Sequence, residues 1–220
     1  MFAVIFEVNP KPEQWDAYLS YAKLLRPELE SIDGFIDNER YGSKRREGWV
    51  LSLSTWRDEK AVIRWRTRAR HHEVQEKGRF EVFRDYHLRV GEVVADTRLP
   101  SGQALREQRF DETEIGEAKF VTITEQRLEA VPTDVSPTAL ASRLCLPVEN
   151  AEASLVDWDI FESIYHPGNF ALLASWRDST AARAFTAPSA DARQRSVRVI
   201  RDYGMFDRRE APQFYPAVQR

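Results

Sequence analysis

An internal repeat constrains the fold of this chain more than any other feature. The segment Ser-Thr-Trp-Arg-Asp at residues 54–58 has a near copy, Ala-Ser-Trp-Arg-Asp, at residues 174–178. The tripeptide Arg-Asp-Tyr follows at residues 84–86 and again at 201–203, so both halves keep the order and nearly the spacing of the two motifs. A repeat of about 100 residues is too long for a solenoid unit. We therefore expect two small domains that pack as a pseudo-dimer.

The composition is that of an ordinary folded protein. Hydrophobic residues make up 42% of the 220 residues and charged residues 30%, and the formal net charge is -3. The 32 Lys and Arg residues nearly balance the 35 Asp and Glu residues, so the chain has no overall basic field that would bind nucleic acid by counterion release. The single cysteine, Cys145, excludes an internal disulfide, and its apolar, helix-like surroundings predict a buried, unreactive thiol.

The N-terminal segment predicts a strand rather than a targeting signal. Residues 1–8 are largely apolar, with neither a basic leader nor a small-residue cleavage site. No apolar run reaches the roughly 18 residues that a membrane-spanning helix needs. We therefore expect a cytoplasmic protein without a membrane partner.

Hydrophobic periodicity in the first copy predicts the element order β-α-β-β-α-β. The predicted strands are residues 2–8, 35–41, 49–56 and 86–94, and the predicted helices are residues 13–29 and 58–77. Pro27 is expected to kink the first helix or tighten its last turn, and Asp58 is expected to cap the second helix. This order matches the ferredoxin-like unit.

The second copy repeats the order in a more diverged form. Strands are predicted at residues 120–126, 155–164 and 170–176, and a short helix at residues 136–146. A further helix is predicted from Asp178 toward Val199, with an interruption at Pro188. The last strand, from Tyr203 onward, has only a weak pattern.

The expected fold class is α+β, with two ferredoxin-like βαββαβ repeats forming one intramolecular pseudo-dimeric α/β barrel. The expected divisions are a first repeat at residues 1–95, a linker at 96–117, a second repeat at 118–210 and a C-terminal tail at 211–220. Both faces of the first strand are largely apolar, which suits a sheet between helices and a partner sheet. Two sheets that close on each other can leave space for a small apolar ligand, so a ligand chamber is expected between them.

Short motifs in the first copy point to a protein family. They are Phe-Glu-Val-Asn-Pro at 6–10, Leu-Arg-Pro-Glu-Leu-Glu at 25–30, Gly-Phe-Ile at 34–36, Leu-Ser-Leu-Ser-Thr-Trp-Arg-Asp-Glu at 51–59, and Trp-Arg at 65–66 with His71. This set resembles the antibiotic biosynthesis monooxygenase family, which has the dimeric α/β barrel fold. The resemblance covers residues 1–95 and reaches the second copy only through the repeat. Its superfamily includes cofactor-free monooxygenases that oxidise polycyclic phenols, small quinol oxygenases, haem-binding and haem-degrading enzymes, and proteins without established activity, so the fold alone does not select a reaction.

The resemblance implies candidate site residues in the first copy. Haem-binding relatives have an axial histidine in the second helix, an asparagine near the end of the first strand and a nearby tryptophan. His71, Asn9 and Trp65 match these positions, with His72 as an alternative to His71. An imidazole nitrogen is a competent axial ligand, and an asparagine amide could donate to bound oxygen. The competing interpretation is that both histidines lie on a solvated, arginine-rich helix.

The second copy lacks an equivalent imidazole. With Trp56 aligned to Trp176, the positions of the two histidines hold Asp191 and Ala192. We therefore expect one site per chain, in the first repeat, with the second repeat as its cover.

Tyr86 and His87 are further candidates at the start of the last strand of the first copy. Neighbouring residues of a strand point to opposite faces, so only one of the two can face the cavity. With His71, they are the candidate bases or orienting groups for a substrate.

The functional prediction is a monooxygenase that oxidises an aromatic or polycyclic small molecule with molecular oxygen. The chain has no glycine-rich phosphate loop, Cys-x-x-Cys, His-Glu-x-x-His or Gly-x-Ser-x-Gly motif, so we expect neither a nucleotide cofactor nor a metal site. Such a protein would work without a bound cofactor. The alternatives are a haem-binding or haem-degrading enzyme that uses His71 and a non-catalytic protein that binds an apolar small molecule. Further association into a homodimer is left open.

Overall fold

The computed structural model describes residues 1–131, 135–146 and 153–218. The first half contains β1 (Phe2–Pro10), a short 3-10 helix η1 (Pro12–Gln14), α1 (Trp15–Glu30), β2 (Phe35–Ser43), β3 (Val50–Trp56), α2 (Glu59–Arg66), α3 (Ala69–Lys77), a π-helical turn η2 (Gly78–Val82) and β4 (Phe83–Asp96). The second half contains β5 (Phe120–Arg127), α4 (Pro137–Arg143), β6 (Leu155–Ser163), β7 (Asn169–Trp176), α5 (Ser179–Ala184) and β8 (Arg193–Gly204).

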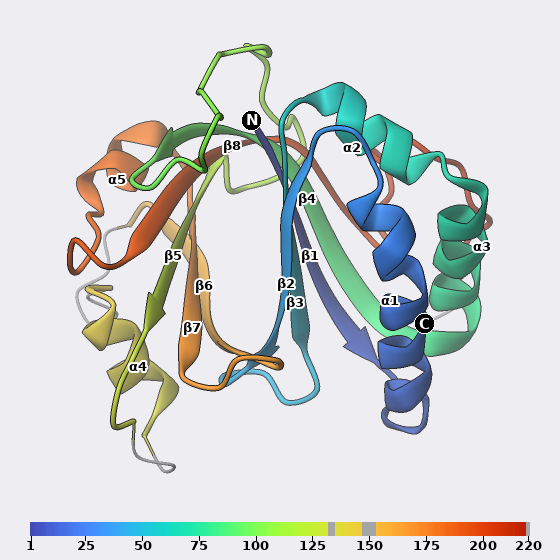
Figure 1. Cartoon of the computed structure of the whole chain (residues 1–220), viewed down its shortest axis with the longest axis horizontal. Helices are drawn as coiled ribbons and strands as arrows, with labels where there is room; N and C mark the ends of the chain where they lie inside the picture. The colour runs from blue at the N-terminus through green and yellow to red at the C-terminus, as the bar shows by residue number, and fades with distance from the viewer. Residues whose placement is uncertain (132–134, 147–152, 219–220) are drawn as a thin grey trace.

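The eight strands form one closed barrel with helices on its outside. The strand order around the barrel is β1-β3-β2-β6-β7-β5-β8-β4. Helices α1, α2 and α3 cover the first half, and α4 and α5 lie on the opposite side (Figure 1). Each half has the ferredoxin-like α+β order predicted from the sequence. In the described ranges, no helix is long and apolar enough to cross a bilayer.

The prediction of one helix over residues 58–77 is wrong in one respect, because the segment forms two helices, α2 and α3. Asp58 caps α2 as expected, accepting a hydrogen bond from the backbone N–H of Ala61 at 2.8 Å. The extended backbone of Arg68, with φ -64° and ψ 130°, then interrupts the helical path before α3 begins. The break turns α3 relative to α2 and places η2 at the entrance to β4. Pro27 lies inside α1, which continues past it to Glu30.

Two expectations for the second half are also wrong. The helix predicted between residues 178 and 199 ends at Ala184, because Phe185 is extended at φ -77° and ψ 113°. Residues 193–204 form β8 instead, and the alternation of buried Val197 and Val199 with partly exposed Arg198 has the period of a strand. Cys145, expected to be buried, is exposed.

The interior of the barrel, where a ligand chamber was expected, is packed with side chains. This core consists of Met1, Ala3, Ile5, Tyr41, Leu51, Leu53, Val93, Val121, Ile123, Phe161, Ala171, Leu173, Val197 and Val199. Both halves contribute to it, so the two sheets are joined by a shared apolar core.

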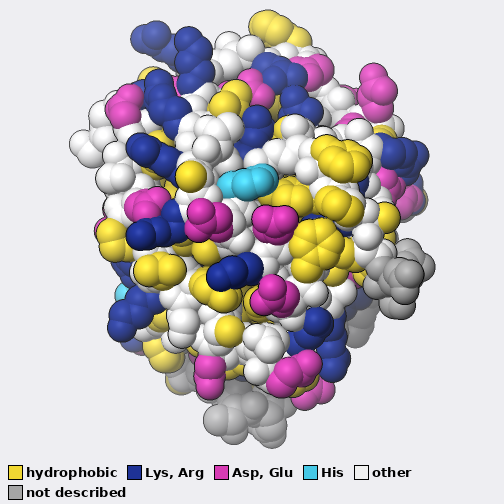
Figure 2. All heavy atoms as spheres, turned by 90° about the vertical axis from the view of Figure 1, so that its right-hand side faces the viewer, with side chains coloured by type: hydrophobic (Ala, Val, Ile, Leu, Met, Phe, Trp, Pro, Cys, Tyr) yellow, Lys and Arg dark blue, Asp and Glu magenta, His cyan; other side chains and the backbone are white. Residues whose placement is uncertain are grey.

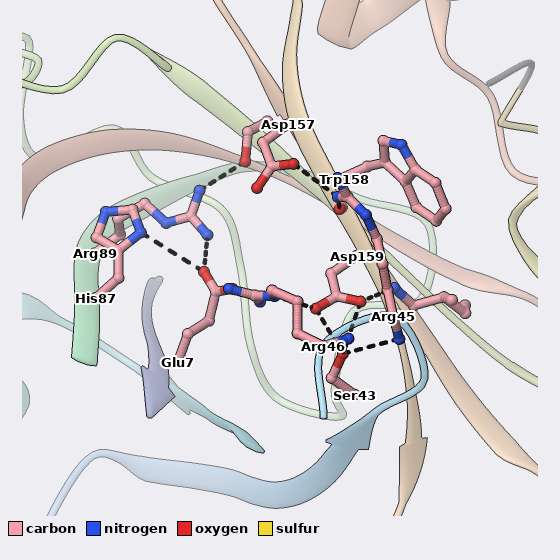
Figure 3. A network of polar contacts seen from close by, with 11 residues as sticks. Glu7, Ser43, Arg45, Arg46, His87, Arg89, Asp157, Trp158 and Asp159 are labelled. Atoms are coloured by element: carbon pink, nitrogen blue, oxygen red, sulfur yellow. Dashed lines mark hydrogen bonds and ion pairs between the residues drawn. The ribbon is translucent and has the colours of Figure 1, made fainter. Parts of the chain in front are cut away.

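A buried polar network accompanies this core. Glu7 of β1 is only 3% exposed and accepts hydrogen bonds from Arg46 and Arg89 (Figure 3). Arg46 also donates to Asp159 of β6 at 2.7 Å, so the ion pairs cross the seam between β2 and β6. Burial raises the pKa of Glu7, but the two guanidinium groups outweigh burial and hold that pKa below its ordinary value.

The second seam of the barrel positions the candidate site. Strand β8 pairs antiparallel with β4, from His87 opposite Gly204 to Asp96 opposite Arg195. A side chain at Gly91 would collide with the backbone carbonyl of Arg198, so the close approach of these strands requires glycine there. The first-half sheet β2-β3-β1-β4 is thereby extended by a strand from the second half.

Candidate functional site

A cavity of about 210 Å³ lies between the outer face of the extended first-half sheet and the helices α1, α2 and α3. It is therefore under the helices of the first half and not between the two sheets. Figure 2 shows this side of the molecule, where hydrophobic side chains gather among charged ones beside a histidine. The C-terminal segment completes the wall, since Arg208, Gln213 and Tyr215 also line the cavity.

The floor of the cavity consists of two rows of side chains that follow the strand register. One row is Arg40, Ser52, Phe6, Leu88 and Tyr203, and the next is Asn38, Ser54, Val4, Val90 and Arg201. Both rows are apolar in the middle, on β1 and β4, and polar at the edges, on β2, β3 and β8. The floor thus suits a ligand with an apolar body and polar ends.

The roof follows from the amphipathic pattern of α1. Tyr18, Ala22, Leu25 and Leu29 recur at helical spacing, are buried and face the floor. Trp65 and Arg66 at the end of α2 and His71 at the start of α3 continue this roof toward β8.

His71 and Trp65 form a stacked pair at the cavity. Their ring centroids are 4.1 Å apart with an interplanar angle of 19°, and Nδ1 of His71 lies 3.0 Å from the carbonyl oxygen of Trp65. Burial lowers the pKa of His71 to about 4. The imidazole is therefore neutral at pH 7, and because a carbonyl only accepts, Nδ1 carries the proton and Nε2 keeps its lone pair. His71 is half-buried, whereas His72 is exposed and its Nδ1 contacts the Tyr215 hydroxyl at 3.0 Å.

The structure does not bring the other two candidates to this cavity. With its amide oriented to satisfy both groups, Asn9 accepts a hydrogen bond from the indole N–H of Trp49 at 3.0 Å, and it does not line the cavity. His87 points to the other face of β4, where its Nε2 lies 2.6 Å from Asp202. Its Nδ1 lies 3.8 Å from Glu7 (Figure 3).

Tyr86 does line the cavity, and two arginines hold its hydroxyl. Arg79 and Arg208 donate to the phenolic oxygen at 3.1 and 2.5 Å. With both donors facing its lone pairs, the hydroxyl proton of Tyr86 is free to donate to a ligand. The aromatic rings of Phe6 and Phe83 flank Tyr86, with centroids 5.7 and 6.2 Å from its ring.

The lining has an excess of positive charge. Arg40, Arg66, Arg79, Arg201 and Arg208 line the cavity, against one carboxylate, Glu59. Glu59 is itself engaged by Arg109, at 2.7 and 2.9 Å. In the part of the chain that the structure describes, the side chains of Arg66 and Arg201 have no hydrogen-bond or ion-pair partner.

Four buried polar atoms of the lining lack a hydrogen-bond partner. They are the hydroxyl of Tyr18, which is 6% exposed, and the Nε atoms of Arg40, Arg66 and Arg79. A buried polar group without a partner costs about 1–3 kcal/mol, so a ligand that supplied an acceptor there would be bound more tightly. Within the described ranges, no group of three or more His, Cys, Asp and Glu side chains could hold a metal ion.

Sequence analysis identified part of this lining. It found His71, Trp65 and Tyr86, but it assigned no role to Arg66 or Arg201. Arg201 lies in the repeated Arg-Asp-Tyr motif. The repeat indicated that the two halves of the chain are equivalent, but it did not indicate that Arg201 contributes to the site of the first half.

A family model and a similar protein of known name both point to the same protein family. Residues 1–77 match the model of the antibiotic biosynthesis monooxygenase family. The chain is 50% identical over 220 residues to a protein of Pyricularia oryzae named jasmonate monooxygenase ABM. The alignment covers 98% of this chain and 99% of the Pyricularia oryzae protein.

Solved structures of aldoxime dehydratases are similar in fold. One has a TM-score of 0.54 and 11% identity, covering 90% of this chain and 81% of that chain. A second, in complex with butyraldoxime, has a TM-score of 0.55 and 12% identity, covering 90% and 79%. At this level of identity the likeness concerns the fold alone.

Proposed function

Because the chain belongs to the antibiotic biosynthesis monooxygenase family, we propose that it is a monooxygenase for a small apolar carboxylic acid of the jasmonate class. The 50% identical relative named jasmonate monooxygenase supports the reaction and the substrate class. The observation that carries the proposal is the charge of the cavity: its apolar floor is accompanied by Arg66 and Arg201, and neither guanidinium group forms a hydrogen bond or salt bridge with another described residue. Arg201 acts on Asp111 only at longer range. A jasmonate is a cyclopentanone ring with an apolar chain and one carboxylate, and arginine binds carboxylates through two parallel hydrogen bonds.

The proposed reaction requires electrons from outside the substrate. Hydroxylation of a C–H bond inserts one atom of O₂ and reduces the other to water, so O₂ accepts four electrons in total. The C–H bond supplies two of these electrons, so an external two-electron donor must supply the other two together with two protons. Tyr86, with its free hydroxyl proton, and neutral His71 are the groups that would orient the substrate.

An aromatic or polycyclic substrate is the competing proposal. The aromatic wall formed by Phe6, Phe83 and Tyr86 favours a flat ring system. Oxidation of a phenolic methylene to a quinone draws all four electrons from the substrate and needs no donor. It begins, however, with removal of a phenolic proton, and a base such as His71 with a pKa of about 4 is about 8 kcal/mol too weak for a phenol of pKa near 10.

Haem remains an alternative proposal, in which His71 is the axial ligand. Its neutral imidazole, with Nδ1 bound to a backbone carbonyl and Nε2 free, has the state that an iron ligand needs. When bound, haem would supply oxygen activation. The cavity of about 210 Å³ is smaller than the roughly 300–1,000 Å³ typical for drug-sized ligands. A tetrapyrrole would therefore have to displace lining elements.

We also infer that the two halves arose by duplication of one module that now forms a pseudo-dimer. The register supports this inference, because Trp56 pairs with Phe2 in the first half and Trp176 with Phe120 in the second. The domain boundaries and a cytoplasmic location stay predictions.

The test is oxygen consumption by the purified protein with jasmonic acid, with and without a two-electron donor such as ascorbate. We expect one O₂ consumed per product, donor-dependent turnover and one ¹⁸O atom in the product when ¹⁸O₂ is supplied. Donor-independent oxidation of anthrone-like phenols would favour the aromatic substrate instead. If the protein binds jasmonic acid but consumes no oxygen, with or without added haem, the proposed monooxygenase activity is wrong. That result would support the alternative of a non-catalytic binding protein.

A further inference from the structure

We infer that Arg66 and Arg201 together bind the carboxylate of the substrate, so that the second half of the chain supplies part of the specificity of a cavity in the first half. This inference rests on the proposed function. It assigns one end of the cavity to the acid and leaves the apolar body of the ligand on β1 and β4.

Strand pairing places Arg201 at this end of the cavity. Arg201 lies opposite Val90 across the β4–β8 seam, and Tyr203 lies opposite Leu88. Since Val90 and Leu88 belong to the apolar floor, residues paired with them share the same face of the sheet. β8 is therefore the polar edge of the floor on which the ligand rests.

Arg66 lines the same cavity from the roof. It is the last residue of α2, next to Trp65, and it lines the cavity with a buried Nε that has no partner. Burial raises the pKa of Tyr203 to about 12, and the positive charges of Arg208, Arg66 and Arg201, in that order of size, act against that rise. Because the guanidinium groups of Arg66 and Arg201 also line the cavity beside Tyr203, we place the bound anion next to this hydroxyl.

The remaining lining arginines are already engaged. Arg79 donates to Tyr86, to the carbonyl of Met205 at 2.6 Å and to that of Pro216 at 3.2 Å. Arg208 donates to Tyr86 and to the carbonyl of Gln213 at 2.9 Å.

Arg40, at the opposite edge of the floor, donates to the side chain of Asn38 at 3.1 Å. Arg40 lies in the same row as Tyr203 but four strands away, which is roughly 19 Å measured along the curved sheet at the usual strand spacing. Arg40 is therefore a matched control, an arginine of the same cavity at the end that the inference does not assign to the acid.

The test compares the binding of jasmonic acid and its methyl ester by isothermal titration calorimetry. The ester keeps the apolar body and loses the charge. We expect the wild-type protein to prefer the acid, and Arg66→Met and Arg201→Met each to weaken acid binding about 10- to 100-fold while binding the ester as the wild type does. The ester thus reports that each variant is folded with its cavity intact.

Arg40→Met is expected to keep the wild-type ratio of acid to ester affinity. A wild-type protein that binds acid and ester equally, or Arg66→Met and Arg201→Met variants that keep the full preference for the acid, would overturn the placement of the carboxylate and leave the proposed function standing. A wild-type protein that binds neither probe would instead overturn the proposed function together with this inference.

Discussion

Arg89 and Arg195 occupy equivalent positions in the two halves of the barrel and make equivalent contacts across its seams. Arg89 lies opposite Ile5 in the strand register, and Arg195 lies opposite Ile123. Each binds a carboxylate of its own half, and each also donates to a hydroxyl of the other half. The acceptors are Glu7 and Ser175, the latter at 2.7 Å, for Arg89, and Glu125 and Thr55, the latter at 2.6 Å, for Arg195.

This relationship predicts that the two halves unfold together. Arg89→Met leaves Glu7 buried with less compensation, so we expect the free energy of unfolding to fall by about 3–5 kcal/mol. Urea denaturation followed by circular dichroism measures this change, and one transition is expected in both proteins. The double variant Glu7→Gln/Arg89→Met should recover part of the loss, because the uncompensated charge is gone. A loss below about 1 kcal/mol in Arg89→Met would contradict a structural role for the pair.

The depressed pKa of His71 predicts a specific dependence of stability on pH. The unfolded imidazole takes up a proton near pH 6.5, whereas the folded one stays neutral down to about pH 4. Protonation therefore favours the unfolded state as pH falls through this window, by up to about 1.4 kcal/mol per pH unit and about 3 kcal/mol in total. We expect His71→Gln to flatten the curve of unfolding free energy between pH 6.5 and 4. An equally steep curve in the variant would place the pH dependence in other groups.

The fold could be predicted from the sequence because the local hydrophobic patterns and the internal repeat both indicate the same βαββαβ order in each half. The repeated tryptophans, Trp56 and Trp176, do occupy equivalent ends of paired strands. Strand β8 was missed because Ala-rich and Arg-rich residues after Asp178 favour a helix locally, and pairing with β4 and β5 overrides that preference.

The position of the cavity could not be predicted from the first strand. Both faces of β1 are apolar, and alternation alone does not show which face packs against the barrel core and which leaves space under helices. Arg201 was visible only as part of a repeated motif, since its place in the first-half site depends on a seam between residues more than a hundred positions apart. His71 and Trp65 were found because they are close in sequence and matched a known family pattern.

The size of the cavity predicts that His71 does not bind haem in the resting protein. We expect added haem to give the same absorption spectrum with the wild-type protein and with His71→Ala, because a ligand of that size does not fit about 210 Å³ without displacing the lining. A titration followed by the Soret band measures this. A Soret band that appears in the wild type and is abolished in His71→Ala would support the haem alternative.

The floor of the cavity predicts one ligand per chain. Val90 lies in the apolar middle of the floor, so Val90→Phe should fill the space and weaken ligand binding by more than about 10-fold, with a cost in stability of about 1–3 kcal/mol. Calorimetric titration of the wild type with jasmonic acid should give a stoichiometry near one. A stoichiometry near two, with one site untouched in Val90→Phe, would show a second site in the other half.

The C-terminal segment is predicted to hold the ligand in the cavity through one side-chain pair. Tyr215 stacks on His72 with ring centroids 5.5 Å apart, and the hydroxyl of Tyr215 contacts Nδ1 of His72 at 3.0 Å. If this pair fixes the segment over the cavity, Tyr215→Ala and His72→Ala should each weaken binding about 3- to 10-fold, and the double variant should be no weaker than either, because both remove the same contact. Phe214→Ala is the matched control, since Phe214 is 89% exposed and should leave binding unchanged. Additive losses in the double variant would mean that Tyr215 and His72 act separately on the ligand.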